Sequence, residues 1–423
     1  MASFYANLPL FGQPRFIFHP IVIYLVGYML WYFIPPFFFD GHNWHIIFLD
    51  QIALFFLVIG VSVAQVITGS LTCEHFNFKI VTVKSYHLWL LSFGVVLYGL
   101  RSYQFSQEGI VSVLHAYASK EGLYVSIKGA LTLPFLLLVW FGIFVFKLKG
   151  NYLLILFELV YAFPSGSKSR FAFVFVSGVL VFVYVYGLSN KRFLQLFFMV
   201  PFVLASLVLY SAVTHDLRTA SINNKHSGLD MISFYNADYV KSAKHLGARF
   251  NLHSTWKLMD GYEALAADLE VKAMNGLFDR LTLQTDDIEN GPGITKLLKR
   301  AMFGHVDSKS ALVWPRNVIL YNVYGLGVLA IGIVHIVLGV ISGVLYTLLF
   351  RKDMYSCLFV FVYIPFAISF LFGADSNITA VLFHVILFFI SLSLPLFVFF
   401  LLKMLRRILL ASLMYSRSGI CIQ

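Results

Sequence analysis

Charged side chains are scarce in this sequence. Only 12% of its 423 residues are Asp, Glu, Lys or Arg, whereas 59% are hydrophobic. Several apolar runs reach the ~20 residues that an α-helix needs to cross a bilayer. The composition therefore indicates a polytopic membrane protein, and we predict an all-α fold.

Cysteines and the common catalytic motifs are also rare or missing. Cys73, Cys357 and Cys421 lie far apart and form no metal, redox or disulfide spacing. No Walker motif, HExxH or GxSxG is present. No internal repeat is visible, which counts against a transporter built from repeated halves. We therefore expect no bound metal and no cofactor.

The charge that is present is mostly positive, with a net charge of +11. Basic loops that face the cytoplasm and anionic headgroups explain this excess without nucleic acid as a partner. The first apolar run follows residues 1–16 and is long enough to remain as an anchor, so no cleavable signal peptide is expected.

The apolar segments and the loops between them predict a topology. The loops on the side of the N-terminus hold 13 Lys and Arg, and the short loops on the other side hold 5, at Arg101, Lys120, Lys128, Lys168 and Arg170. The positive-inside rule then puts both termini in the cytoplasm and the long segment 214–317 outside. Ten spans are predicted, at about 17–39, 46–67, 86–100, 129–146, 152–163, 171–188, 193–213, 318–350, 355–372 and 378–402.

This topology divides the chain into three parts. Residues 1–213 hold seven spans and an outward-facing turn. Residues 214–317 form a large outer loop with a predicted amphipathic helix over about 256–278. Residues 318–423 hold the last three spans and a basic cytoplasmic tail.

The outward turn combines small residues with cations. Ser165, Gly166, Lys168 and Arg170 offer hydroxyls, free backbone N–H groups and two positive charges, which together suit an anionic phosphate. The preceding apolar segment would rise only ~18 Å, so either it starts deep or its outer end is sunk below the surface. The alternative is an ordinary turn whose basic end lies at the headgroups.

Glu158 lies inside an apolar segment, where a carboxylate is costly unless it is paired or wetted. It is either a hydrogen-bonded residue that packs two helices, or a functional one. In the functional interpretation it pairs with Arg170 or Lys168, or accepts a proton.

In the outer loop, Arg249 and His253 are four residues apart, which puts them on one face of a helix. A cation beside an imidazole suits phosphate binding and proton transfer. The alternative is a solvated helix start with an incidental histidine. The histidines of two later spans, His335 and His384, are expected to be hydrogen-bond partners between helices. As intramembrane bases they would instead indicate an O-acyltransferase.

A short helix that ends in a Ser/Gly-rich basic turn, Ser165–Arg170, and is followed at once by the apolar run Phe171–Leu188 resembles the centre of Wzy-type O-antigen polymerases. These are GT-C-like membrane glycosyltransferases related to the O-antigen ligases. A large late outer loop is similar too. Some branches carry an Arg, ten residues and then Gly, and Arg280 and Arg316 fit this spacing.

The resemblance implies a metal-independent enzyme of the bacterial inner membrane. It would polymerise undecaprenyl-pyrophosphate-linked repeat units into a surface polysaccharide at the periplasmic face, with the turn and the two spaced arginines as glycan and pyrophosphate ligands. His253, Glu158 or a loop carboxylate would be the base, with Arg249 beside it. The lipid-linked donor and acceptor and membrane lipids are the expected partners, and a chain-length regulator protein is compatible with the family. An O-antigen ligase and a lipid-linked oligosaccharide flippase remain alternatives.

Overall fold

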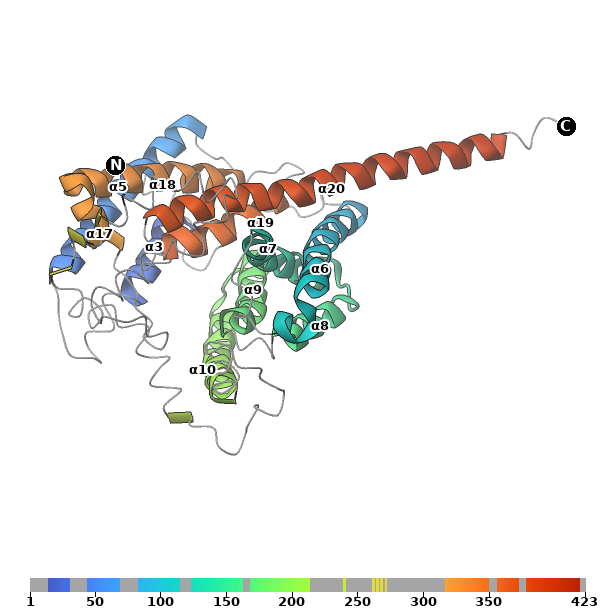
Figure 1. The fold of residues 1–423 in the computed structure, drawn as a ribbon, viewed down its shortest axis with the longest axis horizontal. Coiled ribbons are helices and arrows are strands. Elements are labelled where there is room, and N and C mark those ends of the chain that lie inside the picture. Colours follow the sequence, from blue (N-terminus) through green and yellow to red (C-terminus); the bar gives the residue numbers. More distant parts are fainter. Residues whose placement is uncertain are drawn as a thin grey trace.

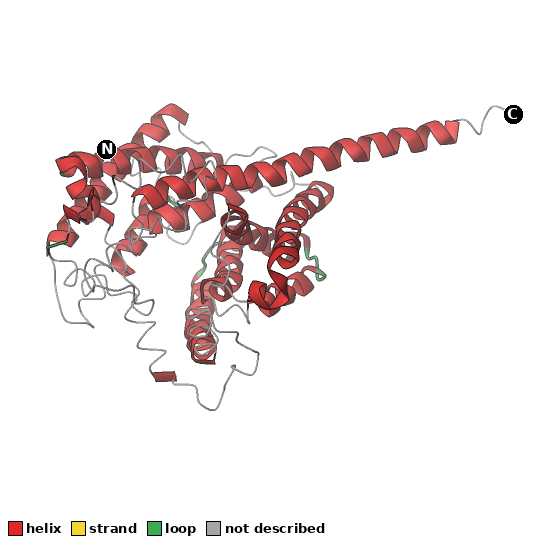
Figure 2. Ribbon diagram, in the orientation of Figure 1, coloured by secondary structure: helices red, strands yellow, loops and turns green. Residues whose placement is uncertain are grey.

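The structure is a computed structural model. It describes residues 14–30, 44–68, 83–114, 123–162, 168–213, 239–240, 261–262, 264–265, 267–268, 271, 316–349, 356–372 and 378–418. Every regular element in this part of the chain is a helix (Figure 2). The main helices are α2 (Pro14–Ile17), α3 (Pro20–Tyr28), α5 (Trp44–Thr68), α6 (Val83–Leu114), α7 (Leu123–Phe146), α8 (Asn151–Ala162), α9 (Lys168–Tyr186), α10 (Asn190–Val213), α17 (Arg316–Asn322), α18 (Val328–Leu349), α19 (Ser356–Phe366) and α20 (Ile378–Ser418).

Within the part of the chain that the structure describes, five stretches are long and apolar enough to cross a membrane. They are Trp44–Thr68, Ile127–Phe146, Lys191–Val213, Val328–Leu349 and Ile386–Leu410. The all-α membrane class is thus confirmed, whereas the predicted number of ten spans stays a prediction. The outer loop 214–317, with its predicted helix over 256–278, lies almost entirely outside the described residues.

Two boundaries near the middle of the chain were predicted wrongly. Arg101 and Lys128 were assigned to an outer loop, but α6 continues to Leu114 and α7 already begins at Leu123. Both side chains are buried inside the bundle, with exposed fractions of 3%. Polar residues end an apolar run in the sequence, yet a helix can continue through them when the bundle supplies partners.

The eighth predicted span also starts later than expected. Residues 318–350 were predicted as one helix, but α17 ends at Asn322 and a 3₁₀ turn follows at Val323–Gly325. Gly325 and Gly327 have positive φ angles of 66° and 56°, which glycine adopts without steric cost. The Gly327 N–H donates to the Tyr321 carbonyl at 3.0 Å, so the break is a hydrogen-bonded turn before α18.

The ninth predicted span has the expected ends but changes its helix type, and the tenth is longer than predicted. α19 contains Pro365, which lacks an N–H, and the helix continues as a π-helix over Ala367–Phe372. α20 runs to Ser418 instead of ending near residue 402, and it extends beyond the rest of the bundle (Figure 1).

α5 and α18 pack very closely because glycines face each other. A Cβ on Gly60 would lie 2.3 Å from the Ile336 carbonyl oxygen, and one on Gly339 would lie 2.6 Å from the Leu57 carbonyl oxygen. Thr68 Oγ1 then donates to Thr347 Oγ1 at 3.3 Å. Small residues allow such contact between membrane helices. Gly60 contacts Gly339, and Thr68, later in α5, contacts Thr347, later in α18, so the two helices run parallel. The predicted topology also has its second and eighth spans run in the same direction.

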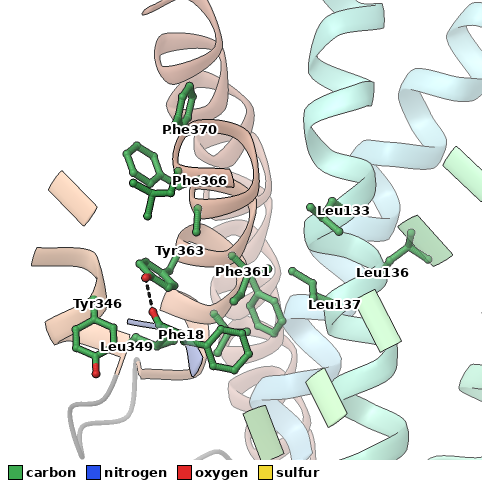
Figure 3. Packing of buried hydrophobic residues seen from close by; sticks show 14 of the residues in the cluster. Phe18, Leu133, Leu136, Leu137, Tyr346, Leu349, Phe361, Tyr363, Phe366 and Phe370 are labelled. Carbon is green, nitrogen blue, oxygen red and sulfur yellow. Dashed lines mark hydrogen bonds between the residues drawn. The ribbon is translucent and has the colours of Figure 1, made fainter. Parts of the chain in front are cut away.

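A buried aromatic cluster joins the two halves of the chain (Figure 3). The Tyr363 hydroxyl donates to the Phe18 carbonyl, and the Phe18 ring meets Tyr184 edge-on at 6.0 Å. Phe141 of α7 meets Phe361 of α19 at 6.1 Å. These contacts hold the chain between α2 and α3 against α9 and α19, and hold α19 against α7.

One end of the bundle is basic. The C-terminal ends of α9 and α18 meet there, since the Tyr184 hydroxyl donates to the Leu349 carbonyl at 3.4 Å. The ends of α7 and α9 meet through Lys147 and Tyr186. Trp89 near the start of α6 stacks on Phe399 of α20 at 4.1 Å. We call this the basic end, and its described cations are Lys84, Lys147, Lys149, Lys191, Arg192, Lys403, Arg406 and Arg407.

The opposite end contains the buried charges. The described charged residues that the bundle buries are Asp50, Arg101, Lys128, Glu158 and Arg316. They lie in the first turns of α5, α7 and α17, the distal half of α6 and the last turns of α8. The exposed cations in the described residues gather at one end, whereas the buried charged residues gather at the other.

Candidate functional site

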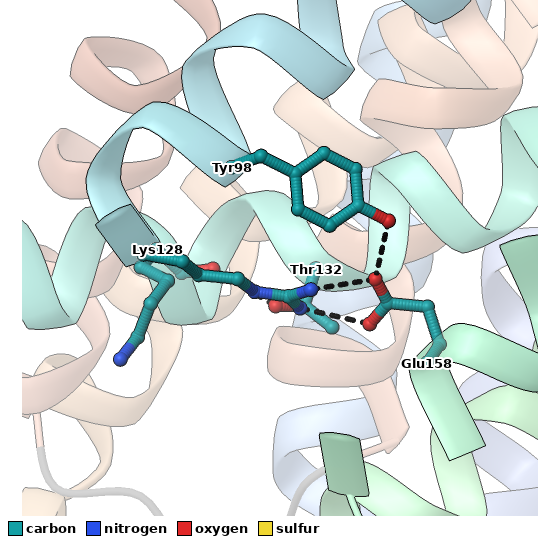
Figure 4. A network of polar contacts seen from close by, with 5 residues as sticks. Tyr98, Lys128, Thr132 and Glu158 are labelled. Carbon is teal, nitrogen blue, oxygen red and sulfur yellow. Dashed lines mark hydrogen bonds and ion pairs between the residues drawn. The ribbon is translucent and has the colours of Figure 1, made fainter. Parts of the chain in front are cut away.

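A buried ion pair joins α6 to α8 (Figure 4). Arg101 NH1 and NH2 donate to the two oxygens of Glu158 at 2.6 and 2.8 Å, and the Tyr98 hydroxyl donates to Oε1 at 2.9 Å. Glu158 is only 3% exposed. The bidentate geometry matches the guanidinium fork to the carboxylate, which is the strongest form of this contact.

Aromatic rings enclose the guanidinium. The Arg101 Cζ atom lies 4.1 Å from the centroid of the Tyr161 ring and 5.1 Å from that of Tyr98. Cation–π contacts of this kind gain strength when water is excluded. The sequence predicted that Glu158 pairs with Lys168 or Arg170; the structure instead satisfies both of its oxygens with Arg101. Closeness in the sequence favoured the wrong cations, because the actual partner lies 57 residues away on another helix.

A second polar contact lies one helical turn along α6. Lys128 Nζ donates to Gln104 Oε1, and both residues are buried. The Lys128 side chain points away from the Arg101–Glu158 pair (Figure 4). Because Arg101 and Gln104 are three residues apart, they project from neighbouring positions of the same helix face. This face therefore binds α7 and α8 through polar contacts.

Glu158 lies one turn before the end of α8, and the predicted phosphate turn follows directly. At the other end of α8, Asn151 Nδ2 donates to the Val139 carbonyl at 3.0 Å, two turns before the end of α7. The depth of this short helix in the membrane stays a prediction. The Tyr210 hydroxyl of α10 donates to the Ala162 carbonyl at 2.9 Å, and its ring stacks on Phe171 at 4.5 Å. Tyr210 thus contacts both flanks of residues 163–170.

A third polar group lies at the start of α17, directly after the predicted outer loop. Asn317 Nδ2 donates to Asp50 Oδ1, and the Tyr24 hydroxyl donates to the same oxygen at 3.4 Å. Arg316 NH1 donates to the Phe370 carbonyl, in the π-helix, at 3.0 Å. The side chains of Tyr24, Asp50, Arg316 and Asn317 are all buried, and so is the Phe370 ring. The start of α17 is thereby fixed to α3, α5 and the π-helix.

His335 lies beneath this group. Its Nδ1 is 2.9 Å from the Ile331 carbonyl, and the ring meets Tyr24 edge-on at 6.0 Å. The predicted hydrogen bond from His335 to another helix is therefore wrong, because Nδ1 bonds within α18, Nε2 is buried without a hydrogen-bond partner among the described residues, and the contact with α3 is ring packing on Tyr24. His384 lies in α20, among residues whose side chains are not described.

The predicted site residues divide into those that the structure describes and those outside it. Glu158 and Arg316 are buried in the contacts above. Lys168 and Arg170 lie in the first turn of α9, so the turn immediately precedes a 19-residue helix. The remaining five predicted positions lie outside the described residues: Ser165, Gly166, Arg249, His253 and Arg280.

Sequence reasoning missed Arg101, Tyr98, Asp50 and Asn317. Asp50 carried a usable signal, because an acidic residue inside an apolar segment needs a partner. The sequence signal for Arg101 is weaker, because this residue follows an apolar run and is therefore predicted to be a loop cation. Within the described ranges, no three or more His, Cys, Asp or Glu residues cluster in a way that could hold a metal ion.

Comparison of the chain with known protein families, curated proteins and solved structures gave no match.

Proposed function

We propose that this protein is a membrane glycosyltransferase that polymerises undecaprenyl-pyrophosphate-linked oligosaccharide repeat units at the periplasmic face of the inner membrane. The observation that carries the proposal is the polarity of the bundle. The buried charged residues lie at one end, together with the proposed phosphate turn and the start of α17. Among the described residues, the cations with exposed side chains lie at the other end. By the positive-inside rule, the basic end faces the cytoplasm.

The turn at residues 163–170 is the proposed pyrophosphate site. Its residues lead into the N-terminus of α9, where free N–H groups and the helix dipole favour an anion. Lys168 and Arg170 add two cations in that first turn, and Ser165 and Gly166 add a hydroxyl and an unhindered N–H. A pyrophosphate leaving group can be stabilised by such fixed donors.

The proposed reaction exchanges one glycosidic bond for another. The bond between the anomeric carbon of the donor glycan and the pyrophosphate oxygen breaks, and the lipid pyrophosphate leaves with the bonding electrons. The hydroxyl of the acceptor repeat unit forms the new bond to the anomeric carbon, and its proton passes to the base. His253, with Arg249 four residues before it, is our candidate for this base.

We assign Glu158 a positioning role and not the role of the base. Its two oxygens already accept three hydrogen bonds from Arg101 and Tyr98. Both oxygens are thus occupied by donors from α6, and the carboxylate fixes the last turn of α8 and hence the start of the proposed phosphate turn. Arg316 likewise anchors the outer segment through the Phe370 carbonyl, which leaves Arg280 as the spaced arginine proposed to reach the glycan.

The surface glycan of a deletion strain tests this proposal. A polymerase deletion should leave single repeat units capped on lipid A. Free lipid-linked polymer would instead assign the ligase function, which differs only in its acceptor. Loss of the outer-leaflet intermediates would assign the flippase function.

A further inference from the structure

The loop between α7 and α8 contains an unusual backbone conformation. Lys147 follows the last residue of α7 and has a φ angle of 56°, and among the described residues it is the one non-glycine residue with a positive φ. The Leu148 N–H donates to the Gly142 carbonyl at 3.1 Å, as in helix ends that normally use glycine. The end of α9 follows this preference, since Gly187 has a φ angle of 66°. A lysine is therefore present where glycine would be less strained.

The Lys147 side chain meets a second cation at one tyrosine. Lys147 Nζ donates to the Tyr186 hydroxyl at 2.8 Å, and that hydroxyl donates to the Phe144 carbonyl at 2.9 Å. Arg192 donates to the Tyr186 carbonyl, and its Cζ atom lies 5.5 Å from the centroid of the same ring. Lys147 Nζ lies at the same distance, 5.5 Å, from that centroid. Two positive charges thus share one aromatic ring.

The start of α10 adds a second unfavourable arrangement. Lys191 and Arg192 lie in its first turn, which contains no acidic residue. A helix N-terminus carries partial positive charge and repels cations, whereas it attracts phosphate. The Arg192 N–H and the Phe193 N–H both contact Ser189, through its hydroxyl at 3.4 Å and its carbonyl at 2.8 Å. The helix therefore begins at a fixed point beside the cations.

Among the described residues, α7, α9 and α10 contain no Asp or Glu that could balance this group. The acidic residue of α8, Glu158, lies near the opposite end of that helix and pairs with Arg101. Directly beyond the cations, α10 exposes a row of large apolar side chains, Phe193, Leu194 and Phe198, which are 55%, 55% and 68% exposed. Apolar side chains next to cations at the end of a membrane bundle match the acyl chains and the headgroup of a lipid.

We propose that Lys147, Lys191 and Arg192 form a binding site for the phosphate of an anionic phospholipid, whose acyl chains cover the exposed face of α10. The bound phosphate offsets the repulsion between the cations and the α10 N-terminus, and it compensates for the left-handed conformation of Lys147. The site lies at the basic end, away from the proposed pyrophosphate turn, and does not depend on the proposed function.

Thermal unfolding of the purified full-length protein in a neutral detergent tests this site. Phosphatidylglycerol is titrated into the protein, with phosphatidylcholine and inorganic phosphate as comparison ligands. The wild type should be stabilised by phosphatidylglycerol and not by the other two. Each cation near an anionic lipid surface contributes roughly a fivefold change in affinity. Lys147→Gly and Arg192→Gln should therefore each raise the half-saturating lipid concentration about fivefold.

Lys147→Gly also separates lipid binding from a structural role. Without anionic lipid, this variant should unfold at or above the wild-type temperature, because glycine relieves the left-handed conformation. Lys84→Gln, which removes an exposed cation at the same end, is the matched control and should keep the wild-type lipid affinity.

Three results would overturn the proposal. Equal lipid affinities in Lys147→Gly, Arg192→Gln and Lys84→Gln would mean that the basic end attracts lipid only through its total charge. Stabilisation by inorganic phosphate equal to that by phosphatidylglycerol would assign the site to a free anion. A lower unfolding temperature of Lys147→Gly without lipid, together with unchanged lipid affinity, would give Lys147 a purely structural role.

Discussion

Replacing the Arg101–Glu158 pair tests how the phosphate turn is held. Glu158→Leu leaves the guanidinium of Arg101 buried without its carboxylate, and Arg101→Met leaves the carboxylate without its cation. Both residues are only 3% exposed, so water cannot replace the lost partner. Breaking a buried pair from one side typically costs about 3–5 kcal/mol. Each single variant should therefore unfold at a clearly lower temperature than the wild type.

The double variant gives a different expectation. Replacing a whole buried ion pair with apolar residues of similar size is often neutral or stabilising. Arg101→Met with Glu158→Leu should therefore recover most of the stability that either single variant loses. The recovery should not be complete, since the double variant also loses the hydrogen bond from Tyr98 to Glu158 and the packing of Tyr161 on the guanidinium.

Activity of the same three variants separates positioning from catalysis. Purified enzyme is assayed with lipid-linked repeat units, and unfolding is followed in the same detergent. If Glu158 only positions the turn, the double variant should recover turnover along with stability. A stable double variant whose turnover stays about 100-fold or more below the wild type would refute our assignment and make Glu158 the general base. Single variants as stable as the wild type would show that the pair does not hold α6 and α8 together.

Further predictions concern other parts of the chain. A reporter fused at Asn290 should read as extracytoplasmic, and a cytoplasmic reading would place the proposed site in the wrong compartment. Arg170→Ala should slow polymerisation by roughly 30- to 1000-fold at normal protein level, because it removes a charge-assisted phosphate contact. Normal polymer length in this variant would show that the turn has only a structural role. His253→Ala should lower turnover of the purified enzyme ~100-fold or more with lipid binding intact, and near-normal turnover would exclude it as the base. Gly60→Val should lower the unfolding temperature through overpacking of about 1–3 kcal/mol or more, whereas Gly99→Ala, whose added Cβ would meet nothing within 4 Å, should change it little.

The polar contacts at the opposite end also suggest how the outer segment is attached. Asp50, Asn317 and Tyr24 join α17 to the first membrane helices, and Arg316 joins it to the π-helix. The outer segment would therefore be fixed at its exit point, while the phosphate turn is fixed separately by Glu158 and Tyr210. Two independently anchored parts could present a base and a phosphate site to one substrate.

The sequence alone determined the membrane class and the approximate positions of most helices. Composition and apolar length suffice for this, because a membrane helix satisfies its backbone hydrogen bonds within itself and must show lipid an apolar surface. The sequence also identified Glu158 as a buried acid that requires a partner, since the free-energy cost of a carboxylate in an apolar segment follows from the apolar residues around it.

The tertiary structure decided which partners satisfy the buried polar groups, and hence where the helices end. Arg101 and Lys128 look like loop residues in the sequence, but Glu158 and Gln104 from other helices let α6 and α7 continue through them. The close packing of Gly60 against Gly339 and the left-handed conformation of Lys147 were also decided by the tertiary structure and not by the sequence pattern. Each depends on atoms far away in the chain or on the local path of the backbone, and neither composition nor periodicity records these.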